Sequence, residues 1–179
     1  MATALVGAIV LGVLSTFYDF LWAHFEVRHS VVNGLVHGMT LLSVAGLVLA
    51  WPRRPGAGLA GGAAAGLLAA ASFYAFYPLL GYLWAIVAAW MLLWLLFGAL
   101  EAWLRGAPPV SAPVLLRGLV AAALSGAAFY SVSGMWTDHS AAPNYLRNLA
   151  SWTFAFFPGF AALLWRQGFS PADNVAVRR

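Results

Sequence analysis

Long apolar segments joined by short polar links constrain this chain more than any other feature. A helix needs roughly 20 apolar residues to cross the hydrocarbon core of a bilayer. Six segments meet this length: residues 4–27, 30–51, 56–80, 81–104, 114–136 and 146–165. The links between them carry proline, glycine and arginine, as turns do. The sequence therefore predicts an all-α, polytopic integral membrane protein, a bundle of six transmembrane helices.

The composition leaves little room for a second kind of structure. Hydrophobic residues make up 63% of the 179 positions and charged residues only 8%. A chain with so few charges cannot cover a water-soluble catalytic or DNA-binding domain. The net charge of +4 comes from arginines scattered at helix ends, which argues against nucleic-acid binding. We expect one six-helix domain over residues 1–166 and a polar tail over 167–179.

The arginines also predict an orientation in the membrane. With a cytoplasmic N-terminus, two arginines fall on the outer side, Arg28 and Arg147, and seven fall on the cytoplasmic side: Arg53, Arg54, Arg105, Arg117, Arg166, Arg178 and Arg179. Positive residues favour the cytoplasmic side, so both termini are predicted there. Abundant Ala, Gly and Arg without Lys indicates a GC-rich bacterium and its inner (plasma) membrane. The first helix lacks the pattern of a cleaved signal peptide and is expected to be retained.

Small residues at regular spacing predict where helices pack closely. Lipid tails are as apolar as leucine, so helices in a membrane associate through close packing at small side chains. Such a stripe is formed in the third segment by Gly58, Gly62, Gly66 and Ala70, and a shorter one in the second segment by Gly34 and Gly38. We interpret both stripes as packing faces.

A few polar side chains in the first two segments are left without an evident structural role. Asp19 lies about 8 Å below the membrane boundary at 1.5 Å per residue, and such acids usually face a bundle interior or a water-filled cavity. Asn33 and His37 form part of a polar stripe on the next helix. With Trp22 they are candidates for the polar mouth of a lipid-binding cavity. The aromatic residues Phe73 and Trp136 complete this candidate set.

Catalytic signatures are not recognisable in the sequence. It has no serine elbow, no HExxH and no phosphate-binding glycine loop, so we predict a non-enzymatic protein without cofactor or metal. His29 and His37 are eight residues apart, about 12 Å along a helix, which is too far to share one ion. Two alternatives stay open. One is an intramembrane metalloprotein or enzyme using Asp19, His24, His29 and His37, and the other is a small proton-coupled transporter using Asp19 and His37.

The C-terminal half resembles the Insig family of six-helix membrane proteins, most strongly over residues 90–167. The resemblance rests on Gly134-Met135-Trp136, Pro143-Asn144-Tyr145-Leu146, Ser151-Trp152 and the final Arg166-Gln167, with Trp94, Phe97, Glu101 and Arg105 upstream. The double proline and double cysteine of that family's second helix are missing here.

The resemblance implies an apolar lipid, diacylglycerol-like or sterol-like, bound within the helix bundle. It also implies a partner-binding position at Asn144, where the family has aspartate. The expected partner is therefore membrane lipid. A homo-oligomer stays open, and the sequence identifies no protein partner.

Overall fold

The chain folds into helices alone over the residues that the structure describes. The computed structural model describes residues 1–25, 31–133 and 144–165. Within these ranges it has five helices and no strand: α1 (Ala2–His24), α2 (Val31–Ala50), α3 (Pro55–Leu104), α4 (Ala112–Ser133) and α5 (Tyr145–Leu164). The predicted all-α class is thus confirmed for this part of the chain.

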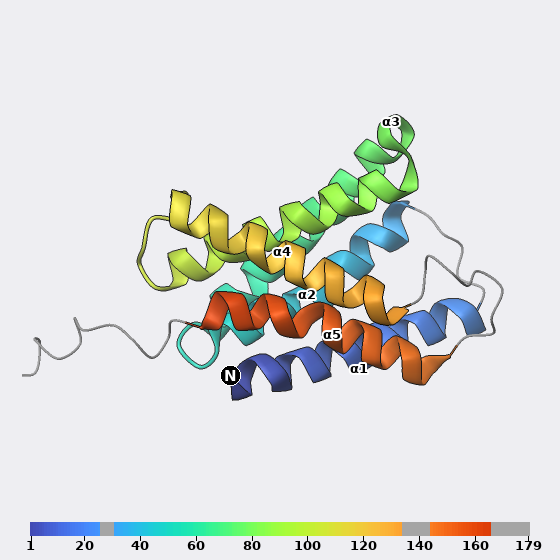
Figure 1. The fold of residues 1–179 in the computed structure, drawn as a ribbon, viewed down its shortest axis with the longest axis horizontal. Helices are drawn as coiled ribbons and strands as arrows, with labels where there is room; N and C mark the ends of the chain where they lie inside the picture. The colour runs from blue at the N-terminus through green and yellow to red at the C-terminus, as the bar shows by residue number, and fades with distance from the viewer. Residues whose placement is uncertain (26–30, 134–143, 166–179) are drawn as a thin grey trace, which may run out of the picture.

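Helix α3 is bent back on itself at Gly81, as Figure 1 shows. A straight helix of 50 residues would be about 75 Å long and would hold residues 61 and 100 far apart. Instead, a Cβ atom added to Gly61 would stand 2.5 Å from the Leu100 side chain. Gly81 permits the bend because its φ of 74° lies in the left-handed region that suits glycine. The element α3 thus consists of two helical arms, residues 55–80 and 82–104, joined at Gly81.

The predicted count of six helices is therefore not confirmed. The expected spans 56–80 and 81–104 belong to the single element α3, because the chain turns at Gly81 without an intervening link. Among the described helices, four are long and apolar enough to cross a membrane, namely α1, α2, α3 and α4. The expected span 146–165 corresponds to α5, which is not among these four helices. Its mean hydropathy is lowered by Arg147, Asn148 and Pro158.

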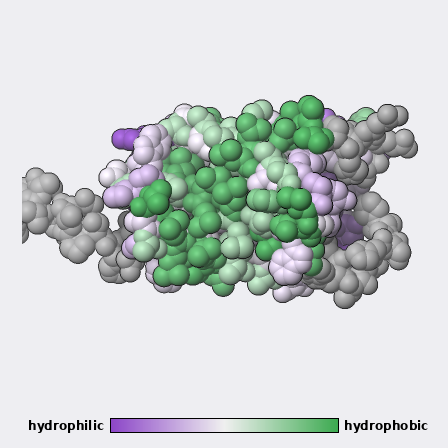
Figure 2. Space-filling view, turned by 90° about the horizontal axis from the view of Figure 1, so that it is seen from above, coloured by the Kyte–Doolittle hydropathy of each residue, from purple (hydrophilic) through white to green (hydrophobic). Residues whose placement is uncertain are grey.

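The surface shows the distribution that these apolar helices predict. Hydrophobic residues cover the middle of the face in Figure 2, and more hydrophilic residues lie toward its two ends. Many large apolar side chains are exposed on this scaffold, among them Leu68, Leu116 and Leu124 at 50% or more. Such exposure is costly in water and favourable in hydrocarbon. The fold is that of a helical membrane protein.

Helices α2 and α3 meet through glycines. A Cβ atom added to Gly46 would stand 2.6 Å from the Cα atom of Gly62, and one added to Gly38 would stand 2.9 Å from the Gly66 carbonyl oxygen. These distances leave no room for a side chain, so the two backbones are in direct contact. The predicted packing role of the glycine stripe is confirmed.

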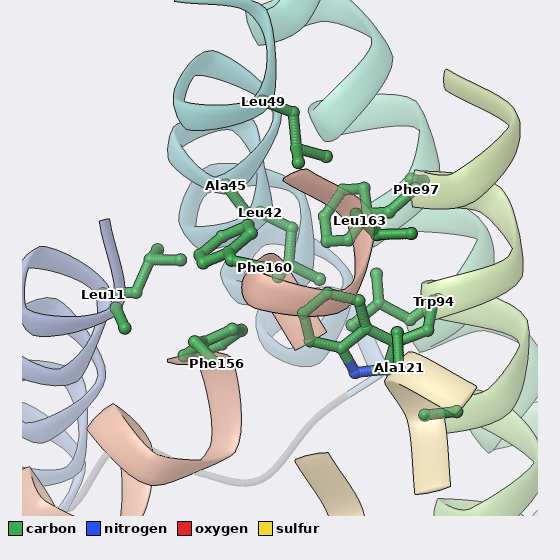
Figure 3. Packing of buried hydrophobic residues seen from close by; sticks show 14 of the residues in the cluster. Leu11, Leu42, Ala45, Leu49, Trp94, Phe97, Ala121, Phe156, Phe160 and Leu163 are labelled. Carbon is green, nitrogen blue, oxygen red and sulfur yellow. The ribbon is translucent and has the colours of Figure 1, made fainter. Parts of the chain in front are cut away.

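Helix α5 lies between α1 and α4 (Figure 1). Its residues Phe156 and Phe160 are buried between Leu11 of α1 and Trp94 of α3, as Figure 3 shows. The rings of Trp94 and Phe160 are 5.8 Å apart in an edge-on arrangement that aromatic pairs favour. α5 thus connects parts of the chain that are distant in sequence.

Candidate functional site

Asp19 joins α1 to α5 at membrane depth. Its Oδ2 atom accepts hydrogen bonds from the indole Nε1–H of Trp152 at 2.9 Å and from the amide Nδ2 of Asn148 at 3.3 Å. Asn148 and Trp152 are one helical turn apart, so both donors reach the carboxyl group from the same face of α5. An acid inside a membrane is costly unless it is hydrogen-bonded, and the two donors of α5 provide these hydrogen bonds.

His37 belongs to α2 and packs against α1. Its ring stacks on Tyr18 with the centroids 4.3 Å apart, and it meets the edge of Trp22 at 5.7 Å. The Tyr18 hydroxyl is hydrogen-bonded to the Thr40 hydroxyl at 2.8 Å. One stretch of α1 therefore contacts α2 through Tyr18 and Trp22 and α5 through Asp19. Asn33, one turn before His37, also has an interaction partner.

A cavity of about 630 Å³ lies between the second arm of α3, helix α4 and Trp152 of α5. Small residues of α4 create the hollow: Ala122, Ala123, Gly126 and Ala127. Aromatic side chains form much of the remaining wall: Tyr82, Trp90, Phe129, Tyr130 and Trp152. The volume lies within the range of about 300–1,000 Å³ of small-molecule sites. The segments of α3 and α4 that line it belong to helices long enough to cross a membrane.

Trp152 connects this cavity to Asp19. One side of its indole lines the cavity, where its ring lies 4.8 Å from that of Phe129, while its Nε1–H donates to Asp19. The hydrogen bond therefore fixes the orientation of one wall. Trp90 contributes a second indole, whose Nε1 is buried and has no hydrogen-bond partner among the described residues. The Trp90 Nε1 atom is covered by protein, so the cavity presents a mainly apolar and aromatic surface.

The candidate ligand-binding residues that the sequence predicts lie in different parts of the structure. Asp19, Trp22 and His37 lie close together around α1, but none of them lines the cavity. Phe73 packs against Tyr82, which does line it, with ring centroids 5.9 Å apart. Trp136 lies outside the described residues. The residues that sequence reasoning missed are Trp90, Phe129, Tyr130 and, as a site residue, Trp152.

The sequence does contain an indication that Trp152 pairs with Asp19. An acid inside a membrane segment requires donors from another helix, and the Asn148–Trp152 pair is spaced to provide two of them. Which side of each aromatic residue faces a hollow depends on helix packing, which the sequence does not reveal.

Asn144 caps α5. Its side-chain Oδ1 accepts the backbone N–H of Arg147 at 3.0 Å, the usual arrangement at a helix N-terminus. This gives the residue a local structural role. The partner-binding role implied by the family resemblance stays a prediction.

The histidines and acids of the described residues do not gather into a metal-binding group of three or more. His24 stacks on Phe20, with centroids 5.2 Å apart, and His37 stacks on Tyr18. Glu26 and His29 lie outside the described part of the chain.

Comparisons of the chain with protein-family models, with curated proteins and with solved structures find no match.

Replacing Asp19 with alanine is expected to lower the free energy of unfolding by about 1–3 kcal/mol. Two interhelical hydrogen bonds are lost, and each contributes about 0.6–1.7 kcal/mol in membrane proteins. Asp19→Asn keeps an acceptor oxygen and should recover at least half of the loss. Unfolding by denaturing detergent, followed by circular dichroism, measures both variants. Wild-type stability in Asp19→Ala would contradict a role for this group in joining α1 to α5.

Proposed function

We propose that this protein binds an apolar lipid, of a diacylglycerol-like or sterol-like kind, in the cavity between α3, α4 and α5, without catalysing a reaction. The observation that supports the proposal is the cavity itself, with about 630 Å³ of volume and mainly apolar and aromatic walls. Pockets with such linings favour apolar ligands held by a few oriented polar groups. The resemblance to the Insig family, which binds sterols within its bundle, agrees with this proposal.

The polar groups favour a lipid that carries a hydrogen-bond acceptor. Tyr82 and Tyr130 line the cavity, and a tyrosine hydroxyl can both donate and accept a hydrogen bond. An ester carbonyl or a hydroxyl group of a diacylglycerol-like molecule can form a hydrogen bond with such a hydroxyl, whereas a plain hydrocarbon cannot. Asp19 supports the site indirectly, because it orients the Trp152 wall.

The proposal includes a topology. Each arm of α3, residues 55–80 and 82–104, is long enough to cross the hydrocarbon core. If α5 also crosses, the chain has six crossings. Arg53, Arg105 and Glu101 then lie together at one membrane face, while Arg147 lies at the opposite end of α5 from Arg105. The positive-inside rule assigns the arginine-rich face to the cytoplasm, with both termini, in a bacterial inner membrane.

Mass spectrometry of lipid extracted from protein purified in a mild detergent tests the binding. We expect one lipid class to be enriched over the membrane from which the protein came. Gly126→Leu should remove this enrichment, because a Cβ atom at Gly126 would stand 3.7 Å from Trp90 and a leucine side chain would extend into the cavity.

Gly56→Leu is the matched control, since a Cβ atom there meets nothing within 4 Å. This variant should keep the enriched lipid. An extract of wild-type protein with the composition of the bulk membrane would refute the proposal. Loss of the lipid in both variants would show that the effect does not depend on the cavity.

A further inference from the structure

A group of arginines surrounds one buried acid at the end of the bundle where α3 ends. Glu101 is 3% exposed and forms an ion pair with Arg105, whose guanidinium also donates to the Leu163 carbonyl oxygen at 3.2 Å. Arg53 and Arg54 line the same small recess as Glu101. Glu101 is thus held by Arg105, and Arg105 in turn is fixed to the C-terminal end of α5.

Arg117 of α4 forms the longer of the two ion pairs with Glu101. Its guanidinium lies 3.8 Å from the Glu101 carboxylate, which is longer than a hydrogen bond, and about 30% of its side chain is exposed. Burial lowers the pKa of the Arg105 guanidinium, and the positive charges of Arg117 and Arg53 lower it further. Four arginines and one carboxylate thus lie at this end of the bundle among the described residues, so positive charge is in excess by three.

An apolar groove of about 640 Å³ begins beside Arg117 and runs between α4 and α5. On α4 it extends from Pro113 to Leu124, and on α5 from Trp165 to Phe157. Eleven residues of α4 correspond to about 16 Å, which is close to half of the 30 Å hydrocarbon core. The groove therefore has the length of one membrane leaflet. Trp165, 71% exposed at the arginine end, suits the headgroup level.

We propose that this groove binds one acyl chain of an anionic phospholipid, with the lipid phosphate held by Arg117. The excess of positive charge complements a phosphate, and arginine binds phosphate oxygens through paired hydrogen bonds. The apolar groove with its charged end fits a molecule that has one anionic end and a long apolar chain. This site lies on the opposite face of α4 from Gly126, so it is separate from the cavity proposed above.

Native mass spectrometry with phosphatidylglycerol and phosphatidylcholine of identical acyl chains tests the site. Both lipids carry the phosphate, but the choline cation of phosphatidylcholine meets the excess positive charge of the arginines, so we expect phosphatidylglycerol to bind at least about tenfold more tightly. Arg117→Gln should reduce this preference about tenfold, and Arg117→Lys should keep part of it, because lysine retains the charge but not the paired geometry. Leu124→Trp, which fills the apolar end, should weaken phosphatidylglycerol binding with the arginines intact.

Two controls separate this site from general attraction to anionic lipid. Arg147→Gln removes one positive charge at the other end of α5, and Gly126→Leu fills the other cavity, so both should keep the wild-type preference. Equal binding of the two lipids to the wild type would overturn the proposal. An equal loss in Arg117→Gln and Arg147→Gln would overturn it too, since it would indicate unspecific surface attraction. Unfolding midpoints in lipid-free detergent show whether each variant is folded.

Discussion

Gly62→Ala is expected to lower the free energy of unfolding by about 3 kcal/mol, although the change adds a single methyl group. That methyl group would meet the Leu42 carbonyl oxygen and stand 2.9 Å from the Cα atom of Gly46. Both are backbone atoms, so the helices must separate to relieve the clash. Overpacking usually costs about 1–3 kcal/mol. We expect a cost at the upper end of this range, because the atoms in contact belong to the backbone and no side chain can move aside.

The matched control is Gly56→Ala in the same helix. A methyl group there meets nothing within 4 Å, and alanine favours a helix over glycine. Its stability should stay unchanged or rise by up to about 1 kcal/mol. Unfolding of both variants in denaturing detergent, monitored by circular dichroism, gives the comparison. Equal stability of Gly62→Ala and Gly56→Ala would contradict direct contact between the α2 and α3 backbones.

Trp94→Ala is expected to lower the free energy of unfolding by about 3–5 kcal/mol, as large aromatic truncations in cores do. Trp94 is 0% exposed, and its ring packs against the backbone of Gly159 in α5 and against Phe97 and Phe160 (Figure 3). Removing the indole leaves a hollow where α3 and α5 meet.

Trp94→Phe separates packing from hydrogen bonding at this position. The indole Nε1 of Trp94 has no hydrogen-bond partner among the described residues, so phenylalanine loses volume but no hydrogen bond seen there. Its cost should be less than half that of Trp94→Ala. The same unfolding assay measures both variants. A loss in Trp94→Phe as large as in Trp94→Ala would indicate that the indole N–H has a partner essential to the fold.

The sequence predicts those features that depend on neighbours along the chain. Apolar length predicts the helices, and four-residue spacing predicts the contact face at Gly58, Gly62 and Gly66, because both are properties of one helix. The predicted spans 56–80 and 81–104 meet at Gly81, where the structure reverses the chain within the single element α3, so the count of six separate helices is not confirmed among the described residues.

The site is harder to predict because it depends on distant residues. Asp19 was recognised as unusual from its own segment, but its donor Trp152 lies 133 residues away. The cavity arises where Gly126 of α4 faces Trp90 of α3. Neither residue alone indicates a hollow, since glycine and tryptophan are both common in packed membrane helices. Only the relative rotation of the helices brings them together.

The position of α5 has a consequence for the order of assembly during synthesis. Helix α1 packs mainly against α5 and only slightly against α2, whereas α2 and the first arm of α3 are adjacent in the chain and in contact. The glycine interface can therefore form while the ribosome is still making α4. Helix α1 leaves the ribosome well before α5, so Asp19 must wait for α5 before it meets its donors. Until then its carboxyl group needs water or another protein in the membrane as a temporary partner.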